Sequence, residues 1–361
     1  MKVAFDHHIF AYQRYGGVSR YFVELASRLP AHGVEASVIA PLHINNYLAN
    51  DSARGLTRGK YVRSEFAGIP LALGLTNRLA APLAWRGANP DIVHETYFSA
   101  KPLGKARRRV VTVYDMIHEL FMPNAKLAIA AKRAAVKRAD HIICISENTR
   151  QDLVRLHDID PARTSVVHLG YSLTAEADSA QDGLRGQRPT LLYVGLRGGY
   201  KNFSTLLQAY SSSPVLREFE LIAFGGPPLR RDEQEEINRL GIGDQVRFES
   251  GTDRELAAHY QAAAAFICPS KYEGFGIPPL EAMSHGCPVV CSNAGSIPEV
   301  VADAGAYFDP NSPEELRTTL ERVATDEALQ ADLRARGYER LAAFSWDKCA
   351  ADTARIYREI V

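Results

Sequence analysis

Short apolar runs alternate with amphipathic segments along the whole chain. This alternation predicts an α/β fold in which parallel sheets are covered by helices. The first-half runs with strand character are VAFD, ASVIAP, DIVHET, VVTVYD, HIICIS and SVVHLG. Those of the second half are TLLYVG, ELIAFGG, QVRFES, AAFICPS, CPVVCS and GAYFDP.

Helical periodicity separates these runs. In residues 19–29, Tyr21, Phe22, Leu25 and Leu29 fall on one face at helical spacing, which predicts a crossover helix. Residues 126–139 repeat the pattern with a basic opposite face, and residues 254–264 form a third such segment. The C-terminal segment 344–361 is helical in pattern with no strand after it.

A polar stretch at 174–189 carries no apolar periodicity and predicts a linker. We therefore expect two doubly wound, Rossmann-like domains, 1–173 and 190–343, that face a cleft. The helix 344–361 is expected to cross back to the first domain. A chain of 361 residues is long enough for two such cores.

Composition narrows the class of protein. The 42 basic and 42 acidic residues cancel, so no overall field attracts nucleic acid, and we expect no nucleic-acid partner. The five cysteines are an odd number and lie mostly in apolar runs, which favours reduced thiols and a cytoplasmic protein. Without an 18-residue apolar span or a signal-peptide core, we expect neither a membrane-spanning helix nor secretion.

The most informative stretch is KYEGFGIPPLEAM, which follows the strand AAFICPS. Its glycines let the backbone approach a ligand closely, and its prolines suit the start of a helix, whose amide groups favour an anion. Glu273 and Glu281, with Glu281 expected in the first helical turn, are suited to hydroxyl groups. A ligand with both phosphate and hydroxyls is a nucleotide sugar.

This stretch resembles the signature of the retaining GT-B glycosyltransferases of family four, in which two glutamates separated by seven residues bind the sugar donor. The resemblance implies that Glu273 lies near the transferred sugar and that Glu281 binds the ribose hydroxyls. It implies that the intervening backbone also contacts the donor, at Gly274, Phe275, Gly276 and Ile277.

A second motif, YVGLRGGYKNF, agrees with the resemblance. It places Gly195, Arg197 and Lys201 directly after a strand. In the family, a basic pair here neutralises the donor diphosphate, so Arg197 and Lys201 are expected to act in catalysis together with Glu273. The motif lacks the G-x-x-x-x-G-K-[ST] pattern, so a P-loop NTPase is not supported. Backbone near Gly251 and Thr252 is expected to hold the nucleotide base.

The first domain is expected to bind the acceptor. Gly16 and Gly17 resemble the family's glycine-rich loop near the donor diphosphate and acceptor. Many relatives place a catalytic-site histidine after the strand VVTV, where this chain has Tyr114 and Asp115. We therefore consider both His118 and Asp115 as catalytic residues, with His118 and His94 as acceptor-binding residues; a structural histidine is the alternative for each.

The resemblance implies a retaining, metal-independent hexosyltransferase without cofactor, whose co-substrate is a nucleotide sugar. We favour GDP-mannose over a UDP-sugar, and a glycan or lipid-linked glycan acceptor in bacterial surface polysaccharide or lipopolysaccharide biosynthesis. The basic helix 126–139 allows a peripheral contact with the inner membrane, with a solvated crossover helix as the alternative. Alternative functions are a GT-B-fold epimerase or phosphorylase, and a non-catalytic nucleotide-sugar-binding subunit.

Overall fold

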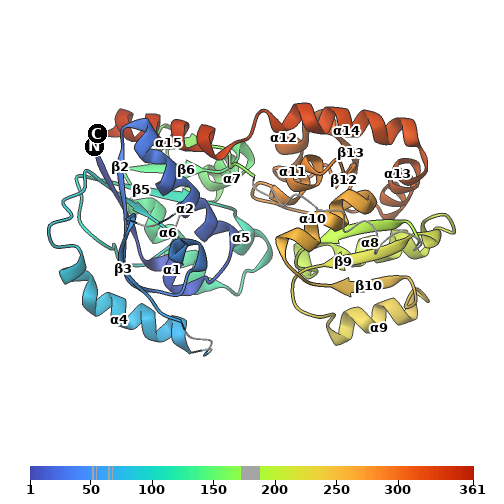
Figure 1. Ribbon diagram of the computed structural model, residues 1–361, viewed down its shortest axis with the longest axis horizontal. Coiled ribbons are helices and arrows are strands. Elements are labelled where there is room, and N and C mark those ends of the chain that lie inside the picture. The colour runs from blue at the N-terminus through green and yellow to red at the C-terminus, as the bar shows by residue number, and fades with distance from the viewer. Residues whose placement is uncertain (51–52, 54, 64–65, 67, 172–187) are drawn as a thin grey trace. The chain divides into compact units, whose positions relative to one another are not determined.

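The chain forms two α/β units, each built on one parallel sheet (Figure 1). The computed structural model describes residues 1–361 except 51–52, 54, 64–65, 67 and 172–187. One unit comprises Met1–Gly170 with Ser345–Val361, and the other comprises Tyr171–Phe344. Most of the expected linker, 174–189, lies outside the described residues.

The sheet of the first unit has the order β3-β2-β1-β4-β5-β6-β7, and all its neighbouring strands are parallel. The order reverses between β1 and β4, which makes the carboxyl ends of these two strands a topological switch point. The strands are β1 (Lys2–Asp6), β2 (Glu35–His43), β3 (Thr57–Tyr61), β4 (Ile92–Glu95), β5 (Arg108–Val113), β6 (His141–Cys144) and β7 (Thr164–Val166).

The sheet of the second unit is also parallel, with the order β10-β9-β8-β11-β12-β13. Its switch point lies between β8 and β11, so the loops after these strands border one crevice. The strands are β8 (Thr190–Val194), β9 (Glu220–Phe224), β10 (Val246–Glu249), β11 (Ala263–Cys268), β12 (Val289–Ser292) and β13 (Gly305–Phe308). The α/β prediction is confirmed.

Helices connect the strands and bury their apolar faces. In the first unit they are α1 (His8–Tyr12), α2 (Gly17–Arg28), α3 (Asn46–Ala49), α4 (Ile69–Ala84), α5 (Ile117–Phe121), α6 (Lys126–Arg138), α7 (Glu147–His157) and α15 (Trp346–Ile360). In the second they are α8 (Phe203–Ser211), α9 (Arg231–Arg239), α10 (Asp253–Ala262), α11 (Ile277–Ser284), α12 (Ile297–Val301), α13 (Pro313–Thr325) and α14 (Glu327–Leu341).

Helix α2 shows how periodicity becomes packing. The face predicted to be apolar is buried, with Tyr21, Phe22 and Leu25 each at most 1% exposed. The C-terminal helix α15 packs against α2 inside the first unit, where Trp346 lies beside Tyr21. None of the described helices is long and apolar enough to cross a bilayer.

Candidate active site

Two loops meet at the switch point of the second sheet and bring Lys201 to Glu273. Lys201 ends the short 3-10 turn Gly199–Lys201 after β8, and Glu273 lies between β11 and α11. The Lys201 Nζ donates to Glu273 Oε1 over 2.7 Å, and the hydroxyl of Ser270 donates to the same oxygen over 2.6 Å. Among the described residues, Glu273 Oε2 receives no hydrogen bond, so it can accept one from a ligand.

The ion pair is largely, but not fully, shielded from water. The side chains of Lys201 and Glu273 are 21% and 14% exposed. Burial disfavours the charged ammonium, but the Glu273 carboxylate outweighs burial, so the pKa of Lys201 is raised above its ordinary value. Lys201 therefore stays cationic near neutral pH and retains N–H groups for an anionic ligand.

The backbone of Glu273 is held by residues that follow β12. Ser296 Oγ donates to the carbonyls of both Glu273 and Phe275 over 2.9 Å. Gly295 has φ +60°, and a Cβ there would lie 2.9 Å from Glu273 N. Only glycine fits this close approach without moving the loop.

The two loops are also tied to each other directly. Lys271 N donates to Tyr200 O over 2.7 Å, and the amide of Asn202 donates to Pro269 O over 3.0 Å. Asn202 adopts the left-handed conformation, φ 61°, at the start of α8, and its side chain is buried. These contacts fix the position of Lys201 relative to Glu273.

Arg197 does not join this pair. Its side chain is 1% exposed and donates to Gly225 O over 3.0 Å, to Pro227 O, and to Glu233 Oε2 over 3.3 Å. Its guanidinium also lies over the ring of Phe248. Three acceptors in the loop after β9 and in α9 therefore hold Arg197 in the interior, and its expected role in catalysis stays a prediction.

Glu281 lies deeper in α11 than expected. The helix begins at Ile277 after Gly276, which has φ 104°, so Glu281 is its fifth residue and not part of its first turn. Glu281 is 9% exposed and its carbonyl accepts from Ser284 Oγ over 2.7 Å. Gly274, Phe275 and Gly276 form the loop that leads into this helix.

The remaining donor-site candidates occupy other ends of strands in the second unit. Gly195 follows β8 with φ +117°, and the space beside its Cα is open. Thr252 caps α10 in a capping box, where its N–H donates to Glu255 Oε2 over 2.6 Å. Gly251 leaves room for that carboxylate, because a Cβ would lie 2.3 Å from it. The Thr252 N–H is thus already engaged within the chain.

Candidates of the first unit follow β1 and β5. Gly16 caps α2 and Gly17 begins it, with open space beside Gly17. Asp115 and His118 lie together after β5, both partly buried. Asp115 Oδ1 accepts from Ile117 N over 3.0 Å, and its carbonyl accepts from Lys132 Nζ over 2.8 Å.

His94 is a core residue. It is fully buried, and its Nδ1 and Nε2 lie 2.5 Å from Tyr357 Oη and 2.8 Å from Thr112 Oγ1. Burial lowers the pKa of His94 to about 3, so the ring is neutral. The acceptor-binding prediction for His94 is corrected, because both nitrogens are used and no surface remains for an acceptor.

The basic face of α6 is partly occupied by carboxylates. Lys132 is 1% exposed and donates to Glu119 Oε2 over 2.8 Å, while Arg138 pairs with Glu95. Lys126, Arg133 and Lys137 remain exposed. In the part of the chain that the structure describes, no group of three or more His, Cys, Asp or Glu residues could hold a metal ion.

Sequence reasoning missed three residues that build the site. Ser270 bonds the Glu273 carboxylate, and Gly295 and Ser296 hold its backbone. Ser270 ends the strand AAFICPS, so its place at the carboxyl edge was the only available signal. Gly295 and Ser296 lie in a turn that has no spacing relation to the two-glutamate motif.

Comparison with protein-family models matches both halves of the chain. Residues 15–175 match Glycosyltransferase Family 4, and residues 174–340 match Glycosyl transferases group 1. A D-inositol 3-phosphate glycosyltransferase from Streptomyces scabiei is 30% identical, covering 95% of this chain and 86% of its own. An O-antigen chain mannosyltransferase B from Escherichia coli is 33% identical over 60% of each chain.

The fold is similar to that of known GT-B structures. Sucrose-phosphate synthase from Thermosynechococcus elongatus aligns with a TM-score of 0.77 and 22% identity, covering 100% of this chain and 99% of its own. At this identity the likeness concerns the fold alone.

Proposed function

The chain belongs to glycosyltransferase family 4 and is a glycosyltransferase of the GT-B fold, and on that premise we propose that it transfers a hexose from a nucleoside diphosphate sugar to a glycan hydroxyl. We favour mannose as the sugar, GDP-mannose as the donor and a glycan or lipid-linked glycan of a bacterial surface polysaccharide as the acceptor. The mannosyltransferase name of a 33% identical relative supports this choice.

The observation that carries the proposal is the Lys201–Glu273 pair at the switch point of the second sheet. There, Lys201 binds the donor diphosphate and stabilises the negative charge that builds up on the leaving nucleotide. Glu273 Oε2 accepts a hydroxyl of the transferred sugar, while Oε1 stays bound to Lys201 and Ser270. The open space beside Gly195 leaves room for the phosphates, and the amides of Gly276 and Ile277 at the start of α11 donate to phosphate oxygens.

The transfer proceeds with retention of configuration and without a metal ion. The leaving phosphate oxygen accepts the proton of the acceptor hydroxyl on the same face of the sugar, so no side-chain nucleophile is needed. Lys201 supplies the charge that a metal ion supplies in other transferases. Arg197 contributes to transfer indirectly, because it stabilises the loop after β9 through the carbonyls of Gly225 and Pro227. To contact the donor directly, its side chain would have to break these hydrogen bonds.

The test is transfer of labelled sugar from GDP-mannose, and from UDP-sugars in parallel, to glycan in a bacterial membrane extract. Label in the glycan, undiminished by a metal chelator and with the donor's anomeric configuration by NMR, is the expected result. An epimerised sugar formed from donor alone would indicate the epimerase alternative. Tight donor binding without transfer to any acceptor would indicate the binding-subunit alternative.

A further inference from the structure

A large cavity lies in the first unit, beside the switch point of its sheet. It has a volume of about 1150 Å³, and its walls are α4 and the segment that joins β4 to β5. No helix forms in that β4–β5 connection, although each doubly wound crossover normally carries one to cover the sheet. Because this connection has no helix, the space beside α4 remains as a cavity.

The cavity is rich in positive charge. Arg78 and Arg86 extend from or just after α4, and Lys101 and Lys105 come from the opposite segment. All four side chains are exposed, and none makes an ion pair or hydrogen bond with another described residue. The described residues that line the cavity include no aspartate or glutamate. These cations have no counter-charge in the cavity wall.

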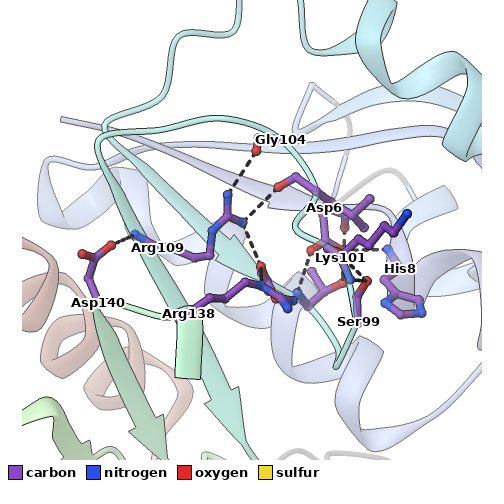
Figure 2. Close-up of polar contacts among 11 residues, drawn as sticks. Asp6, His8, Ser99, Lys101, Gly104, Arg109, Arg138 and Asp140 are labelled. Atoms are coloured by element: carbon purple, nitrogen blue, oxygen red, sulfur yellow. Dashed lines mark hydrogen bonds and ion pairs between the residues drawn. The ribbon is translucent and has the colours of Figure 1, made fainter. Parts of the chain in front are cut away.

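Two acidic groups lie behind the cavity, and both already have hydrogen-bond donors: Glu95 is paired with two arginines, and Asp6 is held by uncharged donors. Glu95 is 1% exposed and accepts from Arg109 Nη1 over 2.8 Å and from Arg138 Nε over 2.9 Å. Arg109 also donates to the carbonyl of Gly104 over 3.0 Å (Figure 2). Asp6 Oδ1 accepts from Thr96 Oγ1 over 2.7 Å and from the N–H of His8 over 2.8 Å. The charge of the four rim residues is therefore left for a ligand.

Three buried polar atoms belong to residues of the cavity wall. Trp85 Nε1, His7 Nδ1 and His8 Nδ1 are buried and have no hydrogen-bond partner among the described residues, and all three residues line the cavity. His7 is only 3% exposed. A buried polar group without a partner costs free energy, so a ligand gains from these atoms only if their side chains turn toward the cavity.

We propose that this cavity binds a phosphate ester carried by the acceptor. The oxygens of the phosphate pair with the rim cations, and the apolar wall of Pro82, Leu103 and Tyr12 packs against the rest of the molecule. The inference rests on the proposed function, because it names the chemical class of the acceptor.

The outer face of α4 carries exposed leucines, which raises the question whether the phosphate belongs to a lipid or to a soluble molecule. Leu71, Leu75, Leu79 and Leu83 form a stripe at four-residue spacing and are 66%, 59%, 84% and 68% exposed. An exposed leucine stripe beside arginines is typical of a helix that lies on an anionic lipid surface. The phosphate can therefore belong to a lipid head group or to a soluble ester, and the test must separate these sources.

The test uses the full chain with two probes, glycerol 3-phosphate in calorimetric titration and phosphatidylcholine vesicles with or without phosphatidic acid in flotation. The Arg78→Ala/Lys105→Ala variant removes one cation from each wall, and Ala81→Phe fills the cavity without changing its charge. Arg231→Ala/Arg239→Ala, on the exposed face of α9 in the second unit, is the control with the same loss of charge.

We expect both cavity variants to weaken binding about tenfold or more, as for loss of a charge-assisted hydrogen bond, and the control to leave it unchanged. Binding of glycerol 3-phosphate indicates a soluble ester, and binding of phosphatidic acid vesicles alone indicates a lipid. Absence of binding to both probes, or an equal loss in the control, overturns the inference.

Donor binding is measured in the same variants by thermal shift with nucleotide sugars. If wild-type protein binds a nucleotide sugar but neither phosphate probe, only the inference about the cavity fails. If it binds phosphate in the cavity but no nucleotide sugar, the proposed function fails. The two failures are thus separate results.

Discussion

Lys201 Nζ lies 2.7 Å from Glu273 Oε1, although 72 residues separate them in the chain. The contact exists because β8 and β11 are neighbours in the sheet, so the loops that follow them meet at its carboxyl edge. A cation and a carboxylate are thereby held beside open backbone, which is the arrangement that a sugar diphosphate requires.

Replacing Lys201 with alanine should slow turnover more than it weakens donor binding. Because its charge is needed most when the diphosphate departs, we expect kcat to fall about 10²- to 10³-fold, as for loss of one oxyanion donor. Lys271→Ala, on the neighbouring exposed lysine, is the matched control and should keep wild-type kcat. Initial-rate kinetics at varied donor concentration measure both, and an unchanged kcat in Lys201→Ala would remove this residue from the mechanism.

Replacing Arg197 with alanine should destabilise the second unit. The change removes the donor to the carbonyls of Gly225 and Pro227 and the buried partner of Glu233, and we expect a loss of about 3 kcal/mol in unfolding free energy. Arg231→Ala, whose side chain is 93% exposed, should change it by less than about 0.5 kcal/mol. Both tryptophans, Trp85 and Trp346, lie in the first unit, so their fluorescence would not report unfolding of the second. Urea unfolding is therefore followed by circular dichroism. Full stability with lost turnover would instead favour direct catalysis by Arg197.

Replacing Gly295 with alanine should disturb the site through the backbone of Glu273. Its Cβ would lie 2.9 Å from Glu273 N, in addition to the cost of about 1–2 kcal/mol for a left-handed backbone. Gly241→Ala pays the backbone cost alone, because Gly241 has φ +66° and nothing within 4 Å of its added Cβ. We expect about tenfold lower kcat in Gly295→Ala only. Equal kinetics in the two variants would show that the position of Glu273 is not critical.

His94 should make the stability of the first unit depend on pH. Burial lowers its pKa from the ordinary 6.5 to about 3, so its contribution is full above pH 6.5 and is lost as the pH falls toward 3. Compared with His94→Gln, the wild type should lose up to about 1.4 kcal/mol more stability per pH unit below 6.5. Tryptophan fluorescence during urea unfolding at several pH values measures this difference, and parallel curves for the two proteins would contradict it.

The strand pattern was predictable because buried parallel strands are nearly continuous apolar runs. All twelve predicted runs contain strands, whereas β3 was missed. Its sequence, TRGKY, is an exposed edge strand with no apolar run, so pairing with β2 alone defines it.

The candidate active site was predictable only where the order of nearby residues in the sequence determines the local structure. The loop and helix around Glu273 follow from glycines and prolines, and the meeting with Lys201 follows from the strand order. The burial of Arg197 could not be read from the sequence, since its partners lie 28 to 36 residues later. His94 likewise depends on Tyr357, 263 residues away, in a helix whose packing the local pattern does not specify.

The position of the donor diphosphate at the switch point of the second sheet is tested most directly by a crystal structure with intact nucleotide sugar. We predict phosphate oxygens within hydrogen-bond distance of Lys201 Nζ and of backbone amides near Gly195 and the start of α11, with a sugar hydroxyl on Glu273 Oε2. A donor bound elsewhere, with the Lys201–Glu273 pair untouched, would contradict the account.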